Sequence, residues 1–525
     1  QISYARGGIN SVAPFFMAEI MDGIIFGGQL EDFAGSIHKE DSKNISMRRS
    51  SGGHKIATFL RQNGYEIDVV DYVHRWKIEQ LKQYLKPIAK DCKFFGFGST
   101  FFLDSPVVKE LVAWLKEEYP HIPRVAGSQN DSMRSLDMDW YVYGYGENAM
   151  LELLKHFDGG PEPIHYNKVI NCYVNYKSFP KDDLTVSYQE RDFVNPREIM
   201  MIEFARGCKF KCKFCSFPIL GVKGDYSRTA QSVYDEMSEN YDKWGIEHYL
   251  VIDETFNDSS EKIEKFANAI EKLPFQPKMT AFIRGDLLAS RPRDWDNLIK
   301  MGITSHFYGI ESMNHKAAKS VGKGMNTGRI QDGLLEVKEY FQTNAGYYKG
   351  LISLIAGLPY ETIDSLRETV RWCSEYWSDQ SYHMNILMIK LLGKPSLNHN
   401  SEFDLNWKDY GYRESQFPKD DIKWDMSINP FYKFLYEYVA TSGEYIMWEN
   451  DYTNMYDCFK FCVEEFSQAK LKNALDPFMY DKFFIDPSVK WSDFATKTHM
   501  ERRESHILEH VDGYIQSKLS LASRV

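Results

Sequence analysis

The chain of 525 residues has no apolar run long enough to cross a membrane, and its mean hydropathy is −0.46. Its most apolar early stretch, Pro14–Gly28, is interrupted by Glu19 and Asp22, so we expect neither a signal peptide nor a membrane anchor. Basic residues are not in excess, since the formal net charge is −11 and the isoelectric point is about 5.8. We therefore do not expect an electrostatic nucleic-acid binder.

Cysteine is also scarce, with eight in the whole chain. Five of them are scattered, at Cys92, Cys172, Cys373, Cys458 and Cys462. Isolated thiols suit a reducing cytosol, so we expect a cytoplasmic protein. Cys458 and Cys462 lie four residues apart in a predicted helix, where they are either auxiliary ligands or, more commonly for thiols with apolar neighbours, packing residues.

The other three cysteines form a close group, Cys208, Cys212 and Cys215, with the aromatic Phe214 just before the last. Three thiolates at this spacing can hold one corner of an iron–sulfur cube. Ferredoxin-type clusters take four cysteines and only carry electrons. A three-cysteine cluster leaves one iron open to a substrate, as an open position does in a catalytic zinc site. The motif therefore indicates chemistry at a cluster.

Two simpler explanations of this cysteine group are a structural zinc site and buried core thiols. A structural zinc site needs a fourth Cys or His nearby, and no His lies between Glu203 and Glu247. Buried core thiols are common singly, but here three lysines are interleaved with the cysteines. Both explanations therefore account for the motif less well than a cluster does.

The motif resembles the signature of the radical S-adenosylmethionine (SAM) enzymes, which is C-x3-C-x2-C with an aromatic residue before the last cysteine. The resemblance implies that Cys208, Cys212 and Cys215 hold a 4Fe-4S cluster, with Phe214 beside the cofactor. In that family the open iron binds the amino and carboxylate groups of SAM. One electron then cleaves SAM to methionine and a 5′-deoxyadenosyl radical. The cofactor supplies this step, and the protein positions it.

Downstream of the cysteines, short apolar segments alternate with helical ones, which predicts six strand–helix repeats and a parallel sheet with helices outside. The predicted strands are Met200–Phe204, His248–Ile252, Lys278–Ile283, Thr304–Ile310, Tyr347–Ile355 and His383–Lys390. A partial barrel of six βα units is the fold of the radical SAM family. The resemblance therefore implies an α/β chain with such a barrel at its centre.

Polar or glycine-rich motifs follow the second to fifth predicted strands, where such sheets place catalytic groups. Asp253 and Glu254 also suit a helix N-terminus, and Arg284 and Asp286 also suit a solvated ion pair. Their order matches the radical SAM family, together with Gly309-Ile310-Glu311-Ser312 and Gly357-Leu358-Pro359-Tyr360-Glu361-Thr362. The resemblance implies that Glu254 and Glu311 lie at the SAM site, that Arg284 binds the carboxylate or ribose of SAM, and that Gly357 and Pro359 shape the turn near the adenine.

A second α/β pattern, from about Gly52 to Phe157, predicts a doubly wound, Rossmann-like sheet that binds ligands at its strand carboxyl ends. It resembles the cobalamin-binding domain that precedes the barrel in one large radical SAM subfamily. The matching segments are Gly64-Tyr65-Glu66-Ile67, Gly96-Phe97-Gly98-Ser99-Thr100, Ala126-Gly127-Ser128-Gln129 and Gly144-Tyr145-Gly146-Glu147. The resemblance implies that cobalamin contacts Gly98, Ser99, Thr100, Gly127, Ser128, Gly144, Gly146 and Glu147.

Two features depart from the cobalamin subfamily. The third segment lacks the G-G-P-H often found there, and no D-x-H-x-x-G motif offers a lower axial histidine, although many members have no protein ligand on that face. His38, His54 and His74 are more typical of surface or helix-end positions. The alternative is a Rossmann-like domain that has lost the cofactor or binds the substrate.

The length predicts about three domains. We expect a Rossmann-like, cobalamin-binding-type domain at residues 1–160, a linker at 161–195, a radical SAM partial barrel at 196–392 and a mainly helical C-terminal domain at 393–525. The linker assignment rests on the composition of Gly160–Pro163 and Phe179–Asp183. Aromatic stripes on the C-terminal helices are most often core, although a few of these residues are expected at the substrate pocket.

The sequence thus predicts a radical SAM enzyme that cleaves SAM reductively with a 4Fe-4S cluster. The resemblance implies methyl transfer from SAM, through cobalamin, to an unactivated centre of a small metabolite. It also implies a low-potential electron donor of the flavodoxin or ferredoxin type, and no nucleic-acid or membrane partner. The alternatives are a ring rearrangement or oxidation without methyl transfer, and a non-catalytic iron–sulfur redox or scaffold protein.

Overall fold

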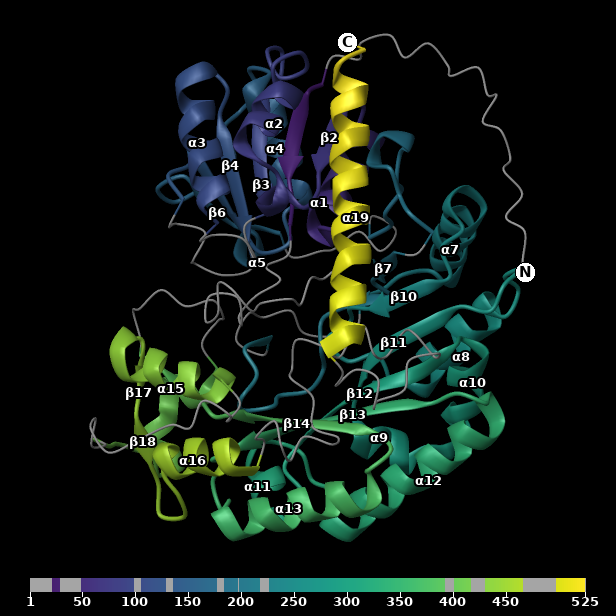
Figure 1. The fold of residues 1–525 in the computed structure, drawn as a ribbon, viewed down its shortest axis with the longest axis vertical. Coiled ribbons are helices and arrows are strands. Elements are labelled where there is room, and N and C mark those ends of the chain that lie inside the picture. The colour runs from purple at the N-terminus through teal and green to yellow at the C-terminus, as the bar shows by residue number, and fades with distance from the viewer. Residues whose placement is uncertain are drawn as a thin grey trace.

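Two six-stranded parallel sheets organise the chain, one in its N-terminal part and one in its central part (Figure 1). The computed structural model describes residues 21–28, 49–98, 105–128, 136–176, 184–196, 198–217, 226–391, 401–416, 430–465 and 497–524. Within these ranges, none of the helices combines the length and the apolar character needed to span a membrane.

The first sheet has the order β2-β1-β3-β4-β5-β6. Its strands are β1 (Gly23–Phe26), β2 (Ile67–Val70), β3 (Phe94–Gly98), β4 (Arg124–Ser128), β5 (Trp140–Tyr143) and β6 (Val169–Asn171). Strand β1 pairs with β2 on one side and with β3 on the other, so the direction of winding reverses between β1 and β3. A doubly wound sheet places its ligand crevice at this switch point, beyond the strand carboxyl ends.

Helices cover both faces of the first sheet, which explains why its strands are apolar on both sides. Helices α1 (Ser51–Gln62) and α4 (Glu147–Phe157) pack on one face. Helices α2 (Ile78–Leu85) and α3 (Pro106–Glu118) pack on the other. The side chain of Ser50 accepts a hydrogen bond from Gly53 N and starts α1 at the carboxyl end of β1.

Two strands of the first sheet do not appear among the strands expected from the sequence. Strand β1 lies inside the apolar stretch Pro14–Gly28, and β6 lies inside segment 161–195, which was assigned to a linker. They have four and three residues, too few to show a strand period. The domain boundaries stay predictions.

The second sheet has the order β14-β13-β12-β11-β10-β7, so each strand lies beside the one before it in the chain. Its strands are β7 (Ile199–Ile202), β10 (His248–Val251), β11 (Lys278–Ile283), β12 (Ile303–Glu311), β13 (Lys349–Ala356) and β14 (Ser381–Ile386). The intervening helices α7 (Ala230–Trp244), α8 (Ser260–Ile270), α10 (Trp295–Lys300), α12 (Thr327–Ala345) and α13 (Ile363–Tyr376) lie on its outer side (Figure 1). The α/β fold with a six-unit partial barrel is confirmed.

The two faces of the second sheet differ in burial. The face toward the helices carries Ile283, Tyr308, Leu354 and Ile386, all buried in the main core. Side chains alternate along a strand, so the residues adjacent to these in the chain point to the other face, which we call the lumen face. There Phe282, Phe307, Ile355 and Asn385 are only half-buried. The lumen face therefore has accessible surface.

The C-terminal helices pack against different parts of the chain. Helices α15 (Pro430–Ser442) and α16 (Met455–Glu465) lie beside the β14 end of the second sheet (Figure 1). Cys458 and Cys462 are fully buried in the core there. Helix α19 (Lys497–Ala522) runs along the first sheet beside β2 and α2 (Figure 1).

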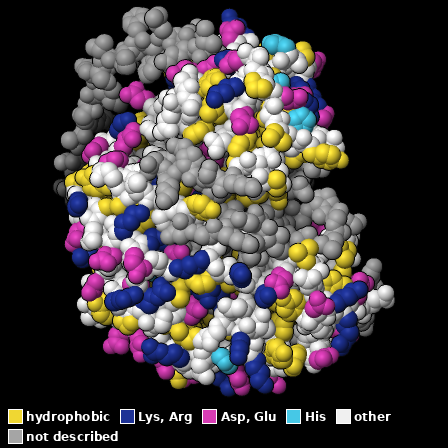
Figure 2. Space-filling view, turned by 180° about the vertical axis from the view of Figure 1, so that it is seen from behind, with side chains coloured by type: hydrophobic (Ala, Val, Ile, Leu, Met, Phe, Trp, Pro, Cys, Tyr) yellow, Lys and Arg dark blue, Asp and Glu magenta, His cyan; other side chains and the backbone are white. Residues whose placement is uncertain are grey.

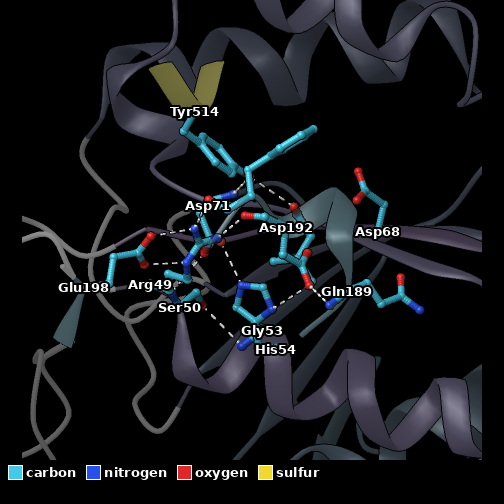
Figure 3. Close-up of polar contacts among 12 residues, drawn as sticks. Arg49, Ser50, Gly53, His54, Asp68, Asp71, Gln189, Asp192, Glu198 and Tyr514 are labelled. Carbon is cyan, nitrogen blue, oxygen red and sulfur yellow. Dashed lines mark hydrogen bonds and ion pairs between the residues drawn. The ribbon is translucent and has the colours of Figure 1, made fainter. Parts of the chain in front are cut away.

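A buried ionic cluster joins the first sheet to the segment just before β7 (Figure 3). The Arg49 guanidinium donates to both carboxylate oxygens of Glu198 at 2.6 and 2.8 Å, and to Asp71 Oδ2 at 2.9 Å. His54 Nε2 lies 2.7 Å from the same Asp71 oxygen. Burial alone would raise the pKa of Asp71, but His54 and Arg49 hold it well below its usual range. His54 does lie in the first turn of α1, but it is buried and not at the surface.

Side chains of helix α19 also contact this ionic cluster (Figure 3). The Tyr514 hydroxyl accepts from Asp71 N at 3.0 Å, and His510 Nε2 lies 3.2 Å from Glu198 Oε1. Lys518 Nζ donates to Asp68 at 2.7 Å with both side chains buried. The C-terminal helix therefore belongs physically to the first sheet.

Charged side chains of both signs are intermingled on the face shown in Figure 2. The described lysines and arginines there alternate with aspartates and glutamates over most of the surface. This part of the chain presents no extended field of one sign to steer a charged partner.

Candidate active site

The three clustered cysteines lie in the loop that follows β7 and the short strand β8 (Ala205–Arg206). Cys215 N donates to Cys212 O at 3.1 Å, which turns the loop back on itself. Burial, with a smaller contribution from the neighbouring Cys212 and Cys208, raises the pKa of Cys215 to about 11. The turn therefore holds the backbones of Cys212 and Cys215 close together, and the role of the three thiols as cluster ligands stays a prediction.

Neighbouring segments hold the cysteine loop from two sides. Lys213 N donates to Val321 O at 3.2 Å, and Phe403 N donates to Lys213 O at 3.3 Å. Gly322 has a φ of +88°, and a Cβ there would lie 3.6 Å from Cys212 Cα. A glycine at this position allows the close approach to the loop.

Two cations face the cysteines. Arg284 Nη1 lies 3.6 Å from Cys212 Sγ, and its guanidinium is 4.1 Å from the Phe210 ring centroid. Burial raises the pKa of Cys212, whereas Lys323 and Arg284 oppose the rise. Within the described residues, no three potential ligands surround a single point for one ion, but in an iron–sulfur cube each cysteine binds a different iron. Three thiols with nearby positive charge suit such a cluster.

Glu311, predicted at the SAM site, has a strained backbone at the carboxyl end of β12. Its φ of +66° is in the left-handed region, which non-glycine residues rarely adopt, and the β12–β13 register shifts here. Lys323 Nζ donates to Glu311 Oε1 at 3.0 Å, and both side chains are buried. A Cβ on Gly309 would lie 2.7 Å from that oxygen. The packing thus fixes one carboxylate at the edge of the sheet.

Arg284 and Glu254, also predicted at the SAM site, lie on either side of the cysteine loop. Arg284 pairs with Asp286 at 2.7 Å, so these two residues do form the ion pair weighed from the sequence, but a largely buried one. Glu254 Oε2 accepts from Gly207 N at 3.0 Å, just before Cys208. Burial and the nearby Glu203 raise the pKa of Glu254 to about 7.

Gly357 and Pro359, predicted to shape the adenine turn, pack against the C-terminal part of the chain. Gly357 has a φ of +95°, and a Cβ there would lie 2.1 Å from the Trp448 ring. The Tyr412 hydroxyl donates to Gly357 O at 2.7 Å. Pro359 is buried in the same turn. Trp448 therefore requires a glycine here, whatever ligand the turn binds.

A buried set of charges links the first sheet to the cysteine loop, and we call Lys55, Glu147, Glu203 and Arg206 the interdomain ion cluster. Arg206 donates to Glu147 at 2.6 Å and to Glu203 at 2.9 Å, and Lys55 bonds the other Glu203 oxygen. Burial would raise the pKa of Glu203, but Arg206 and Lys55 lower it to about 2. Glu147, predicted to contact cobalamin, is thus bonded to a residue two positions before Cys208.

Tyr145 makes a second link across the same interface. Its hydroxyl donates to Glu254 Oε1 at 3.1 Å, and its ring lies 4.0 Å from the Arg206 guanidinium carbon. Tyr145, Arg206 and Lys55 are not among the site residues predicted from the sequence. The available signal was that Arg206 directly precedes Gly207-Cys208, and Tyr145 lies within the predicted Gly144–Glu147 turn.

Gly98 and Gly127 lie side by side in the register of β3 and β4, at their carboxyl ends. A Cβ on Gly98 would make only ordinary contacts, with Ser50 Oγ at 3.4 Å as the nearest atom, and on Gly127 the nearest atom would be 4.0 Å away. Gly27, which the sequence analysis did not single out, directly follows β1 next to them. A Cβ on Gly27 would lie 2.3 Å from Ser50 Cβ, so this glycine packs against Ser50, whereas the described residues leave room beside Gly98 and Gly127. The predicted residues Ser99 and Thr100 lie outside the described residues.

The remaining predicted cobalamin contacts have packing roles in the first sheet. A Cβ on Gly144, which has a φ of +102°, would lie 2.8 Å from the Tyr173 ring. A Cβ on Gly146 would lie 3.1 Å from Val142 and 3.2 Å from Ile56. Ser128 is buried, and its carbonyl accepts from Gly144 N at 2.9 Å. Their contact with a corrinoid stays a prediction.

We predict that Glu361→Gln reduces the pH dependence of stability. Ser312 Oγ donates to Glu361 Oε1 at 2.6 Å, and burial raises the pKa of Glu361 to about 8. The folded chain therefore keeps a proton that the unfolded chain releases above about pH 4.5, so this carboxyl lowers stability as pH rises from about 4.5 to 8, on the order of 3–5 kcal/mol in all. Glutamine stays neutral and can still accept from Ser312.

Thermal unfolding at pH 5 and pH 8 checks this prediction. The unfolding midpoint of Glu361→Gln, relative to wild type, is expected to be higher at pH 8 than at pH 5. Glu368→Gln, on an exposed position of α13, is the matched control and should show no such change. Equal differences at both pH values for Glu361→Gln would show that its carboxyl is ionised in the folded chain.

The chain is similar to known proteins in its central part and, by fold, over most of its length. Residues 202–373 match the radical SAM superfamily. An uncharacterised methyltransferase of Pyrococcus horikoshii is 22% identical over 210 residues, which cover 39% of this chain and 44% of that relative. The match thus spans less than half the length of that relative.

Solved structures extend the likeness to the whole chain. The radical SAM methyltransferase TsrM from Kitasatospora setae, with cobalamin and a [4Fe-4S] cluster bound, is 12% identical over 96% of this chain and 100% of that chain, with a TM-score of 0.58. The cobalamin-dependent SAM radical enzyme OxsB with aqua-cobalamin bound is 13% identical over 93% of this chain and 72% of that chain, with a TM-score of 0.55. At these identities the comparison establishes a shared fold.

Proposed function

We propose that this enzyme, which contains a radical SAM domain, cleaves SAM reductively at a 4Fe-4S cluster and transfers a methyl group from SAM, through cobalamin, to a small metabolite. One observation carries the proposal: the Gly144–Glu147 turn of the first sheet is bonded directly to the cysteine loop, through Arg206 and Glu254. Two cofactor sites that exchange a methyl group must face each other, and these bonds between residues assigned to the two sites support that arrangement.

At the cluster, Cys208, Cys212 and Cys215 are the proposed ligands. Arg284 and Lys323 balance the negative charge of a thiolate-ligated cluster, since both oppose the rise in the pKa of Cys212. The fixed Glu311 carboxylate is positioned to accept hydrogen bonds from SAM. When bound, the cluster would supply the electron that cleaves SAM, and the protein would hold the cluster and SAM in the correct relative orientation.

In the first sheet, the strand ends at Gly98 and Gly127 are proposed to support a corrinoid, because the side chains of the described residues leave room for a Cβ at both positions. TsrM and OxsB, which share this fold, have been solved with cobalamin bound. His54 is fully buried, and both of its ring nitrogens face carboxylates, Nε2 that of Asp71 at 2.7 Å and Nδ1 that of Asp192 at 3.9 Å, so His54 is not available as a lower ligand. We propose a corrinoid with no axial ligand from that histidine.

The substrate is proposed to be a small molecule that binds between the two cofactors. TsrM has been solved with its substrate tryptophan and a SAM analogue, and the likeness covers 81% of this chain and 85% of that chain, with 13% identity and a TM-score of 0.54. The electron donor is proposed to be a flavodoxin or ferredoxin, in a cytoplasmic setting without nucleic acid.

Anaerobic reconstitution tests the corrinoid part of the proposal. The chain is incubated with iron, sulfide and hydroxocobalamin and then desalted, and its absorbance spectrum is recorded. A stoichiometric corrinoid band on top of the cluster absorbance supports methyl transfer. Cluster absorbance without corrinoid would contradict it and favour rearrangement or oxidation by the cluster and SAM alone.

We predict that Gly127→Leu blocks corrinoid binding without affecting the cluster. A leucine there projects from the strand end into the space assigned to the ring, and among the described residues the nearest atom to a Cβ at this position is Phe97 O at 4.0 Å, so the sheet can accept it. Corrinoid retained after desalting is expected to fall at least ten-fold, with iron content unchanged. Gly513→Leu, at an exposed site on α19 with no atom nearby, is the control and should retain both. Full corrinoid retention by Gly127→Leu would place the ring elsewhere.

A further inference from the structure

The guanidinium of Arg284 donates a hydrogen bond to the sulfur of a predicted cluster ligand. Arg284 Nη1 lies 3.6 Å from Cys212 Sγ. Arginine keeps its positive charge at every pH at which proteins are folded. Arg284 is only 8% exposed, so salt and water screen this charge weakly. A permanent, poorly screened positive charge therefore lies against one sulfur of the cysteine loop.

Three neighbours fix the direction of that hydrogen bond. Arg284 Nε and Nη2 donate to the two carboxylate oxygens of Asp286 at 3.0 and 2.7 Å, a bidentate contact that fixes the plane of the guanidinium. The Phe210 ring centroid lies 4.1 Å from the guanidinium carbon. The Arg284 backbone is held as well, because its N donates to Asn257 Oδ1 at 2.8 Å. The edge of the guanidinium that Asp286 leaves open is thus the edge at Cys212.

Lys323, the second cation near the cysteines, is bound differently. Its Nζ donates to Gly309 O and to Glu311 Oε1. Burial raises the pKa of Cys212, and Lys323 and Arg284 both oppose that rise. Both cations therefore stabilise negative charge on the Cys212 sulfur. Arg284 does so through a directed N–H donor, whereas the hydrogens of Lys323 serve two oxygens.

A donor at a ligand sulfur acts on the two oxidation states of a cluster unequally. The reduced state carries one more negative charge, and hydrogen bonds to the sulfurs and net charge are among the factors that set the potential of an iron–sulfur cluster. Arg284 interacts more strongly with the more negative state, so it favours reduction. This effect requires only the cluster and is present before SAM binds.

We propose that Arg284 raises the reduction potential of the cluster by donating its Nη1–H to Cys212 Sγ, and that Asp286 and Phe210 are positioning residues that hold the guanidinium in place. The role is additional to the contact with SAM that the family resemblance implies for Arg284. This inference rests on the proposed function, because it takes Cys212 to be a cluster ligand.

The test is the fraction of reduced cluster at a series of fixed potentials, measured by electron paramagnetic resonance on the reconstituted chain without SAM. The variant combines Arg284→Met with Asp286→Asn, which leaves the net charge unchanged and strands no buried carboxylate. At the wild-type midpoint, the ratio of reduced to oxidised cluster is expected to fall about ten-fold, near the low end for a hydrogen bond to a charged group. For a one-electron couple this is a shift of about 59 mV.

The matched control combines Lys213→Met with Glu402→Gln. Lys213 Nζ donates to both oxygens of Glu402 at 2.6 and 2.8 Å, so this double variant also removes one ion pair of the cysteine loop at constant net charge. The pair is partly exposed and is therefore better screened. The ratio of reduced to oxidised cluster should stay within about two-fold of wild type.

Phe210→Leu tests the proposal even if the Arg284 variant does not fold. Phe210 is half-buried, and its replacement changes no charge. Loss of the ring under the guanidinium should lower the ratio about three-fold, the range of a cation–π contact. Wild-type ratios in Phe210→Leu and in the Arg284 variant, with full iron content, would overturn the proposal.

The affinity for SAM, measured on the same samples, separates the two roles of Arg284. A weaker affinity at an unchanged potential would overturn the proposal and leave Arg284 as a SAM contact alone. A lower potential before SAM is added supports it. A wild-type chain that assembles no cluster would contradict the proposed function itself, and this inference with it.

Discussion

Replacement of Cys212 by alanine is expected to abolish cluster assembly and to lower 5′-deoxyadenosine formation more than about 100-fold. Loss of a residue that only orients a metal ligand typically lowers metal affinity or activity by about 10- to 100-fold, and loss of the ligand itself should have a larger effect. Cys212 lies where the loop is held by Val321 and Gly322 and where Arg284 approaches its sulfur. No other thiol of the described residues lies in this loop besides Cys208 and Cys215. A neighbouring cysteine therefore cannot substitute.

Cys462→Ala is the matched control for Cys212→Ala. Cys462 is fully buried among apolar residues of α16, far along the chain from the loop. Its loss should cost about 1 kcal/mol of stability through a small cavity, with iron, sulfide and nucleoside formation unchanged. Iron and sulfide per chain and 5′-deoxyadenosine are measured for both variants. A Cys212→Ala chain with a full cluster and wild-type cleavage would contradict the ligand assignment.

Arg206→Met is expected to lower the free energy of unfolding by about 3–5 kcal/mol, the usual cost of breaking a buried ion pair by removing one partner. The variant leaves Glu147 unpaired and leaves Glu203 with Lys55 only. It also removes the link between the first sheet and the residues that precede Cys208. Corrinoid retention and 5′-deoxyadenosine formation should therefore both fall in the folded variant.

Denaturant unfolding under anaerobic conditions measures the effect of Arg206→Met. The control is Arg413→Met, which breaks an exposed pair with Glu449 and Asp451 and should leave stability near wild type. Adding Glu147→Gln to Arg206→Met removes the stranded charge and should restore part of the loss. If Arg206→Met and Arg413→Met are equally stable, the interdomain ion cluster does not hold the two sheets together.

The central sheet was predictable from the sequence because its strands are bounded by motifs that must lie at their carboxyl ends. The apolar run Leu351–Ile355 packs in the core of the second sheet. The turn at Gly357 follows this strand and packs against Trp448. The loop with Cys208, Cys212 and Cys215 was equally visible in the sequence, because its signal is a local spacing, although the role of the thiols as cluster ligands stays a prediction.

What the sequence did not reveal depends on partners far apart in the chain. Strand β6 has three residues, and only its pairing with β5 makes it a strand. His54 is buried by Asp71 and by the segment before β7, neither of which its own sequence neighbours indicate. The pairing of Glu147 with Arg206 spans 59 positions. Charges at such separations carry no periodic signal, so only the fold shows which of them meet.

The most direct test of the account is the amount of 5′-deoxyadenosine formed when the reconstituted chain is reduced in the presence of SAM. The account predicts that this nucleoside forms in proportion to the 4Fe-4S cluster content of the preparation. Its complete absence with an intact cluster would contradict a radical SAM enzyme and leave a non-catalytic iron–sulfur protein.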